Sequence, residues 1–270
     1  MNAPEQLTID KLPDVQSETD ARAVKIEKVG IRGLKYPLDV SVGNCKFSSI
    51  GTLDMTVSLA ANIKGTHMSR FIEVLRDYKQ PINHRNLISL GSRMLDKLDA
   101  ESGWIKLTLP FFIEKEAPVS KVRSLMDYEV TWEVAVSTSK DNFLTLNVVV
   151  PVTSLCPCSK NISDYGAHNQ RSHISVSVTL IDLNIDVEKI VEIAEKSASC
   201  ELWGLLKRPD EKYVTEKAYD NPKFVEDLVR DVAIHLKQLK RSERILKFSI
   251  ESENFESIHN HSAYARVESY

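Results

Sequence analysis

Residues 127–137, DYEVTWEVAVS, carry the clearest pattern in the chain. Every second residue is aromatic or β-branched: Tyr128, Val130, Trp132, Val134 and Val136. Side chains alternate between the two faces of a strand, so this spacing predicts a β-strand with one buried face. The polar run at residues 137–142 then predicts a turn that ends the strand.

The first half of the chain has three further strand-like segments, at residues 24–36, 47–61 and 103–114. Between the second and the third, apolar residues recur at helical spacing after Ser69 and again after Asn83. Asn83 is a favourable helix N-cap, and the apolar spacing predicts two amphipathic helices. The first half therefore predicts the order β-β-α-α-β-β.

The second half predicts the same order. The expected elements are strands at residues 143–150, 174–180, 246–250 and 258–268, and helices at 186–202 and 222–239. Asn221 is expected as the N-cap of the second helix and Pro222 as its first residue. Repetition of one supersecondary unit suggests duplication.

Antiparallel hairpins with helices on one face define an α+β fold. We expect a first ββααββ unit at residues 24–139 and a second at 140–270, with most of the chemically informative motifs in the second. Residues 1–23 are polar, acidic and punctuated by proline, which predicts a mobile tail.

The composition is that of an ordinary globular protein, with 42% hydrophobic residues, 27% charged residues and a net charge of −3. This charge gives no general attraction to nucleic acids or anionic membranes, and no apolar stretch has the length of a signal peptide or membrane span. We therefore expect a cytoplasmic protein without a nucleic-acid or membrane partner. Without an export signal, Cys45 and Cys200 are interpreted as reduced, small hydrophobic residues.

Residues able to carry chemistry concentrate in SLCPCSK, residues 154–160, and YGAHNQRSH, residues 165–173. Cys156 and Cys158 flank a proline, and His168 follows across a short polar loop. Thiolate and imidazole ligands suit Zn²⁺ or another borderline divalent metal. The Cys-x-Cys spacing without a second cysteine pair favours an open catalytic site over a closed structural one. A buried structural thiol pair is the competing interpretation.

The segment RPDEKYVTE, residues 208–216, lies between the two expected helices of the second half. Its carboxylates Asp210, Glu211 and Glu216 are candidate oxygen ligands, and a solvated acidic loop is the alternative. Glu226 lies in the expected first turn of the next helix, where a carboxylate complements the helix dipole without any further role.

His259 and His261 lie two residues apart near the C-terminus, so on a strand both would project to one face. Such a pair can donate and accept protons near pH 7; a metal-ligand pair and two incidental surface histidines are the alternatives. His67 and Arg70, at the start of the first helix, either meet a phosphate or are surface residues. No glycine-rich phosphate motif is present, so side chains would have to supply nucleotide recognition.

Taken together, SLCPCSK, YGAHNQRSH, LLKRPDEKYVTEKAYDNPKFVEDLVRD and IHNHSAYA resemble the prokaryotic GTP cyclohydrolase IB family, over a span from about residue 25 to the C-terminus. The resemblance implies a tunnelling fold of two fused ββααββ units. It further implies a homotetramer with β-barrels formed between subunits and active sites at subunit interfaces. The implied reaction opens the guanine imidazole ring of GTP by hydrolysis, releases formate and forms 7,8-dihydroneopterin triphosphate, a first step toward folate or modified nucleosides.

The resemblance also implies the cofactor and its ligands. One divalent ion, Zn, Mn or Fe, would be held by Cys156, His168 and Glu211, and no organic cofactor is implied. Cys158 would be a second active-site thiol, and the reverse assignment of the two cysteines stays open.

The implied substrate contacts come from other motifs. Glu226 would accept hydrogen bonds from the guanine N1–H and 2-amino group, because a carboxylate offers two acceptors to two donors. Glu256, His259 and His261 would form the acid–base group. The triphosphate would meet lysine and arginine side chains, with Arg70, Lys160 and Arg171 as candidates.

Two alternatives remain. The first is a tunnelling-fold nitrile reductase that uses a cysteine nucleophile and NADPH on a deazapurine; the lysine-rich segment expected of it is not visible. The second is a non-enzymatic binding module stabilised by a metal.

Overall fold

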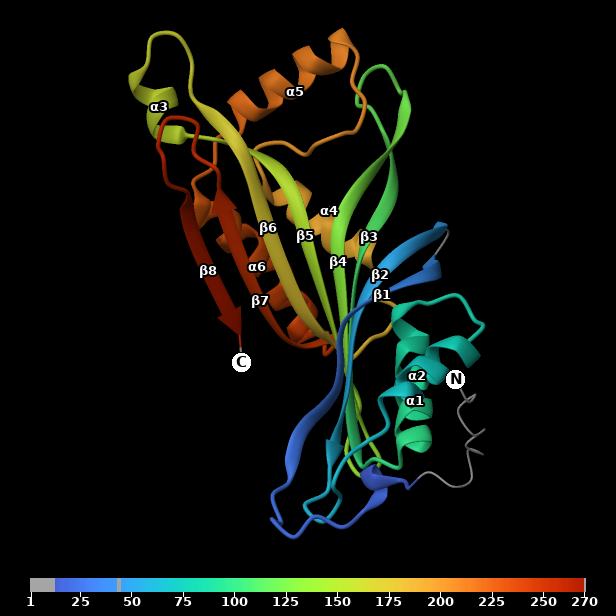
Figure 1. The fold of residues 1–270 in the computed structure, drawn as a ribbon. Helices are drawn as coiled ribbons and strands as arrows, with labels where there is room; N and C mark the ends of the chain where they lie inside the picture. The colour runs from blue at the N-terminus through green and yellow to red at the C-terminus, as the bar shows by residue number, and fades with distance from the viewer. Residues whose placement is uncertain (1–12, 43–44, 270) are drawn as a thin grey trace, which may run out of the picture.

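The computed structural model describes residues 13–42 and 45–269. Its strands form one eight-stranded antiparallel sheet in which each strand pairs with the next in sequence (Figure 1). The strands are β1 (Ile26–Val42), β2 (Cys45–Leu59), β3 (Ser102–Glu116), β4 (Arg123–Ser137), β5 (Phe143–Leu155), β6 (Asn169–Leu180), β7 (Ile245–Asn254) and β8 (Ala263–Ser269). The helices are α1 (Met68–Asp77), α2 (His84–Leu98), α3 (Pro157–Ile162), α4 (Val187–Ser197), α5 (Arg208–Asp220) and α6 (Val225–Arg241).

The first half has the predicted order of two strands, two helices and two strands. The period-two segment is strand β4, whose even-numbered residues from Met126 to Val136 are buried. Asn83 caps α2 as expected: its side chain accepts a hydrogen bond from the backbone N–H of Asn86 at 2.9 Å. The turn predicted at residues 137–142 joins β4, which ends at Ser137, to β5, which begins at Phe143.

The second half contains two helices that the sequence did not predict, α3 and α5. The segment at residues 208–216 is therefore part of a helix, and the interpretation of it as an acidic loop was wrong. A weakly amphipathic helix on the surface has little apolar periodicity, and α5 has only two buried residues, Asp210 and Ala218.

Three predicted boundaries also need correction. Helix α4 ends at Ser197, because the chain then pairs with β5 through the bridge between Thr153 and Cys200. Helix α6 begins at Val225 with Phe224 as N-cap, because Asn221 instead caps the C-terminus of α5. Strand β8 begins at Ala263, so the residues before it form a bend.

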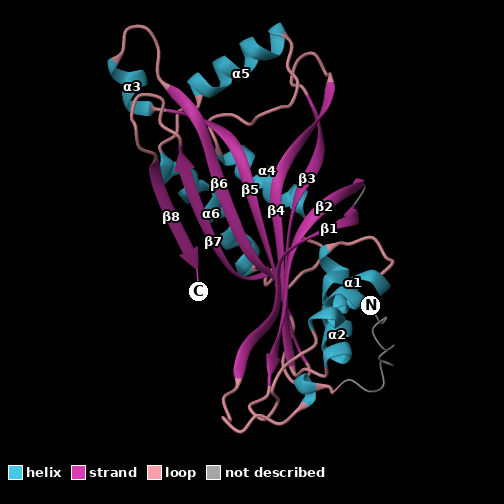
Figure 2. Cartoon of the chain, viewed as in Figure 1, coloured by secondary structure: helices cyan, strands magenta, loops and turns pink. Residues whose placement is uncertain are grey.

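The helices that build the core cover one face of the sheet (Figure 2). In β4, Val136 lies against α2 so closely that a β-carbon on Gly91 would come within 2.7 Å of it. On the same face of β4, the Tyr128 hydroxyl donates to Glu195 of α4 at 2.8 Å. One core thus runs beneath both halves, and the α+β fold class is confirmed.

The opposite face of the sheet is polar. It carries the Thr108–Thr131 hydrogen bond at 2.8 Å and the Lys106–Glu133 ion pair at 3.8 Å. The sheet is open within the described chain, with β1 and β8 as its edges. The two-unit division at residue 139 and the inter-subunit barrel stay predictions.

The segment expected to be a tail is described from residue 13 onward. It contains a 3₁₀ turn (Val15–Ser17) and contacts the loop before α1 through the Glu18–Lys64 ion pair at 2.5 Å and the Asp14–His67 pair at 3.1 Å. Residues 13–20 are therefore in contact with the body of the protein. The prediction for residues 1–12 lies outside the described residues.

Asp210 fixes the start of α5 against the turn between β3 and β4. It is fully buried, and its carboxylate accepts hydrogen bonds from the backbone N–H groups of Val119, Ser120 and Lys207, each at 2.8 Å, and from the Ser120 hydroxyl at 2.5 Å. Burial alone would raise the pKa of Asp210, but these hydrogen bonds, led by those from Ser120, hold its pKa well below the ordinary 3.8.

We expect Asp210→Asn to lower the melting temperature, because the amide NH₂ would face N–H donors where the carboxylate accepts. Since the pKa of Asp210 is depressed in the folded protein, its ionisation stabilises the fold above pH 3.8 and progressively less as the pH falls below that value. The difference in melting temperature between wild type and variant should therefore shrink in acid. Thermal unfolding at neutral and acidic pH measures this, and an equal difference at both would contradict it.

Candidate functional site

The Cys-Pro-Cys motif lies at one end of the sheet, where β5 ends at Leu155. Cys156 is the N-cap of α3, and Pro157 occupies a first-turn position where its missing N–H leaves no helical bond unmade. The backbone N–H of Cys156 donates to the carbonyl of His168 at 3.1 Å. The thiol-bearing turn is thereby fastened to the loop that carries the imidazole.

Two side-chain oxygens lie near Nδ1 of His168, one of them at hydrogen-bond distance. Its Nδ1 lies 3.1 Å from Oε1 of Gln170 and 3.8 Å from Oε2 of Glu256, and the side chains of both His168 and Glu256 are mostly shielded from solvent. A neutral His168 that donates from Nδ1 to Oε1 of Gln170 has no proton on Nε2. The Nε2 atom is then the one available to a metal or a substrate.

The bend between β7 and β8 brings Glu256, His259 and His261 to the same end of the sheet as α3 (Figure 1). Its first residue, Phe255, donates its N–H to the carbonyl of Arg171 at 3.0 Å. The rings of His259 and His261 are exposed and stacked, with centroids 5.1 Å apart and an angle of 11°. The predicted strand at residues 258–262 was wrong, yet the two imidazoles lie side by side.

The cysteines differ in exposure. Cys156 is half-buried, Cys158 is exposed, and Cys200 is 1% exposed, as expected for a small hydrophobic residue. Burial, and next the carboxylate of Glu201, raise the pKa of the Cys200 thiol to about 12. The side chain of Cys45 lies outside the described residues.

Glu211 is not brought to the Cys-Pro-Cys turn within one chain. It lies exposed in the first turn of α5, next to the buried Asp210. The end of α5 that reaches α3 is the other one, where Lys160 lies over the ring of Tyr219 at 4.3 Å and donates to its carbonyl. Glu211 and Tyr219 are eight positions apart on this helix, a rise of about 12 Å.

Glu226 lies exposed in the first turn of α6. Three residues earlier, the N–H of Lys223 donates to the carbonyl of Leu155 at 3.0 Å, so the start of α6 is attached to the end of β5. Arg171 lines a cavity of about 710 Å³ on the polar face of the sheet together with His173. Arg70 lies at the start of α1, in the first half of the chain.

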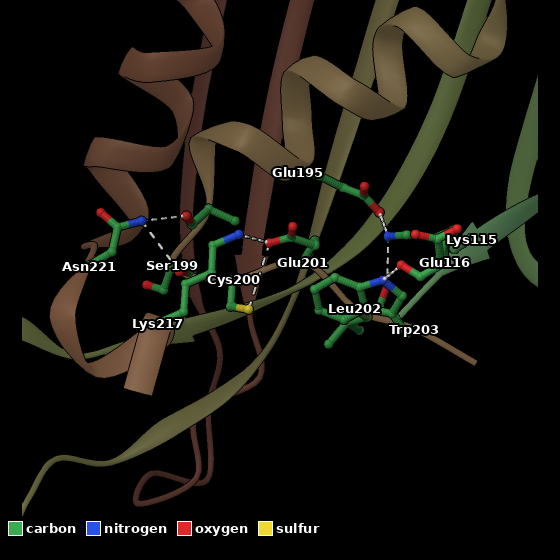
Figure 3. Close-up of polar contacts among 11 residues, drawn as sticks. Lys115, Glu116, Glu195, Ser199, Cys200, Glu201, Leu202, Trp203, Lys217 and Asn221 are labelled. Carbon is green, nitrogen blue, oxygen red and sulfur yellow. Dashed lines mark hydrogen bonds and ion pairs between the residues drawn. The ribbon is translucent and has the colours of Figure 1, made fainter. Parts of the chain in front are cut away.

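Residues 198–203, which we call the crossing segment, connect α4 toward α5 and pass across the end of the sheet (Figure 3). A cavity of about 770 Å³ lies between this segment, the loop before β6 and the exposed side of α5. Its lining includes Leu155, Tyr165, Glu201, Trp203 and Tyr219. The cavity thus reaches the residue that precedes Cys156, and its volume suits a small organic ligand.

The residues present fit a divalent metal in part. A half-buried thiol and an imidazole whose Nδ1 is hydrogen-bonded to a side chain are suitable donors for Zn, Mn or Fe. Over residues 13–42 and 45–269, however, no three His, Cys, Asp or Glu side chains are grouped closely enough to hold an ion. The ligand set Cys156, His168 and Glu211 is therefore not assembled in a single chain and stays a prediction.

Sequence reasoning missed Gln170 and Ser159. Gln170 faces Nδ1 of His168, and the Ser159 hydroxyl accepts from the N–H of His168 at 3.2 Å. The signal for Gln170 was available: it occupies a buried position of the period-two pattern that continues through Ile174, where an apolar residue is expected. Ser159 carried no such signal.

The fold and this site define an α+β protein with thiol, imidazole and carboxylate groups at one end of an open antiparallel sheet. Among solved structures, a uricase from Bacillus fastidious is similar, with a TM-score of 0.53 and 11% identity over 93% of this chain and 94% of that chain. This likeness concerns the fold alone. In the part of the chain that is described, no helix is both long and apolar enough to cross a membrane.

The sequence model of a family described as Type I GTP cyclohydrolase folE2 matches residues 12–265. A protein of Ralstonia nicotianae named GTP cyclohydrolase FolE2 is 52% identical over 259 residues, 95% of this chain and 94% of its own length. One from Methylobacillus flagellatus with the same name is 53% identical over 270 residues, 99% of this chain and 98% of its own length. This chain belongs to the type I GTP cyclohydrolase FolE2 family, which confirms the family indicated by its motifs.

The burial of Cys200 and the exposure of Cys158 predict that the two thiols differ in reactivity. The nucleophile is the thiolate, and a pKa of about 12 keeps Cys200 protonated at neutral and mildly alkaline pH. Iodoacetamide should modify Cys158 in the folded protein and leave Cys200 intact. Mass spectrometry of digested samples checks this, with denatured protein as the control in which Cys200 must react. Rapid labelling of Cys200 in the folded protein would contradict its burial.

Proposed function

We propose that the chain is a GTP cyclohydrolase that opens the imidazole ring of the guanine base of GTP by hydrolysis. The observation that carries this proposal is the gathering of Cys156, His168 and Glu256 at one end of the sheet. It occurs in a chain whose relatives at 52% to 54% identity are named GTP cyclohydrolase FolE2.

The proposed cofactor is one divalent ion, Zn, Mn or Fe, with Cys156, His168 and Glu211 as ligands. The chemistry that such an ion supplies when bound is activation of water for attack on an electrophilic carbon. The backbones of Cys156 and His168 are hydrogen-bonded to each other, whereas Glu211 lies at the distant end of α5. The third ligand would therefore join in the assembled protein, consistent with active sites at subunit interfaces.

The proposed acid–base group moves protons around the guanine ring. His259 and His261 are stacked and exposed at this end of the sheet, and an imidazole both accepts and donates protons near pH 7. One of them protonates the ring nitrogen as the imidazole ring of the base opens. Glu256 approaches Nδ1 of His168 and helps to hold its orientation. C8 leaves as formate, and the ribose carbons rearrange and close onto the opened base to give 7,8-dihydroneopterin triphosphate.

Recognition of the base is proposed for Glu226. Its carboxylate is exposed in the first turn of α6, whose start is attached to the end of β5 by the Lys223–Leu155 hydrogen bond. There it would accept hydrogen bonds from the guanine N1–H and 2-amino group. Cys158, exposed on α3, would be the second thiol of the site.

The finer assignment is a type IB enzyme, a hydrolase acting on cyclic amidines, in the cytoplasm. We propose a homotetramer in which the open edges β1 and β8 pair between subunits to close β-barrels. The net charge of −3 and the absence of an apolar span in the described helices support a protein that acts on GTP without a nucleic-acid or membrane partner.

Purified protein loaded with Mn²⁺ or Zn²⁺ should convert GTP to a product that fluoresces as neopterin after oxidation and dephosphorylation. Cys156→Ala should lower kcat by roughly 1,000-fold, the rate equivalent of several kcal/mol of lost metal assistance. Cys158→Ala, measured in parallel, shows which of the two cysteines is the metal ligand and which is the second thiol. Full activity of Cys156→Ala in the presence of a chelator would exclude the proposed chemistry.

Glu211 and Glu216 form a matched pair for testing the third ligand, since both are exposed carboxylates on α5. If Glu211 binds the metal, Glu211→Gln should lower both the metal content of the purified protein and kcat. Glu216→Gln should change neither. Elemental analysis beside the fluorescence assay checks this, and equal metal content in the two variants would remove Glu211 from the ligand set.

A further inference from the structure

The end of β5 that carries Cys156 is not supported by β4. Strand β4 pairs with β5 only from Glu129, opposite Val149, onward, and its earlier residues pair with β3 alone. Pairing of β5 with β6 continues to Leu155, opposite Asn169. Residues 150–155 therefore have a strand on one side only, and their backbone groups on the other side need partners from elsewhere.

The crossing segment supplies those partners. Thr153 donates its N–H to the carbonyl of Cys200 at 2.8 Å and accepts from the Cys200 N–H at 3.3 Å. The N–H of Leu155 donates to the hydroxyl oxygen of Ser199 at 3.1 Å. Leu155 is 3% exposed and Ser199 0%, so water is not available to this N–H as an alternative partner. Leu155 directly precedes Cys156, and its carbonyl accepts from the N–H of Lys223 at 3.0 Å, so Ser199 and Lys223 together hold the last residue of the strand before the thiol.

The crossing segment is itself held from two sides (Figure 3). From α5 and its C-cap, Lys217 pairs with Glu201, and Asn221 Nδ2 donates to the carbonyls of Ala198 at 2.8 Å and Ser199 at 3.3 Å. Because the crossing segment is itself held in place, it can fix the position of the β5 residues that it contacts.

From the first half, the Lys115 ammonium donates to the carbonyl of Leu202 at 2.6 Å and pairs with Glu195 at 2.5 Å. Trp203 Nε1 donates to the carbonyl of Glu116 at 3.0 Å. The Lys115 and Glu195 side chains are only 12% and 13% exposed, so their pairing is weakly screened by solvent.

We propose that Ser199 is a positioning residue for Cys156: through Leu155 it fixes where the β5 strand ends and where the thiol points. This inference rests on the proposed function. It assigns catalytic importance to a serine that touches neither substrate nor metal. Small misplacements of reacting groups slow the chemical step. Loss of the Ser199–Leu155 hydrogen bond should therefore lower kcat rather than raise KM.

Ser197 provides a matched control two residues away. It is 3% exposed, and its hydroxyl donates to the carbonyl of Ile193 in its own helix at 2.8 Å. Ser197→Ala and Ser199→Ala both remove one buried hydroxyl, but only the second removes the partner of Leu155. Both should lower the melting temperature, so stability alone does not distinguish them.

The experiment compares the full-length wild type, Ser199→Ala and Ser197→Ala in two assays. Ser199→Ala should reduce kcat for GTP by about 10- to 100-fold with little change in KM. Its affinity for Zn²⁺ alone, measured by competition with a chelating dye, should fall by about tenfold. Ser197→Ala should resemble wild type in both, and Ser199→Thr, which keeps the hydroxyl, should recover part of the loss.

An active wild type with Ser199→Ala equal to Ser197→Ala in kcat and Zn²⁺ affinity would overturn the positioning role. An inactive wild type would instead refute the proposed function, and the Zn²⁺ comparison would still test the positioning role. If Ser199→Ala does not fold, Ser199→Cys takes its place, since its thiol fills nearly the same space but is a weak hydrogen-bond acceptor for the N–H of Leu155. Wild-type kcat and Zn²⁺ affinity in Ser199→Cys would then overturn the inference.

Discussion

The register between β5 and β6 is the constraint on which the site depends. These strands pair continuously from Leu144, opposite Leu180, to Leu155, opposite Asn169. That pairing puts Cys156 and His168, twelve positions apart in sequence, on the two sides of one connection, where their backbones are hydrogen-bonded. A shift of one residue would turn the buried side chains of β6 to the polar face, so burial of Ile174, Val176 and Val178 also fixes the chemistry at the strand ends.

Elements set by local patterns were predicted well from the sequence. The alternation in residues 127–137 identified β4, and Asn83 marked the start of α2, because a strand with one buried face and a capped helix both leave short-range signatures. The joint placement of Cys156 and His168 was predictable for the same reason, since only a short loop separates the two motifs.

Elements whose position depends on contacts with distant parts of the chain were not predicted from the sequence. Helix α5 is placed by Asp210, whose partners Val119 and Ser120 lie about ninety positions earlier. The sequence of the α5 segment itself gives no indication of these contacts. The sequence also did not distinguish Asp210, which is buried and structural, from its neighbour Glu211, which is exposed. The crossing segment likewise has no periodicity, because its conformation depends on β3, β5 and α5 together.

The buried contacts of Lys115 have a consequence for the division of labour between the halves. Strand β3 belongs to the half without any of the proposed ligands, yet Lys115 and Glu116 hold Leu202 and Trp203 at the wall of the cavity beside Cys156. The first half, which carries none of the proposed ligands, thus supports the cavity wall in the half that carries them. Loss of these contacts would lower the activity of the enzyme by displacing the cavity wall, with every reactive group still present.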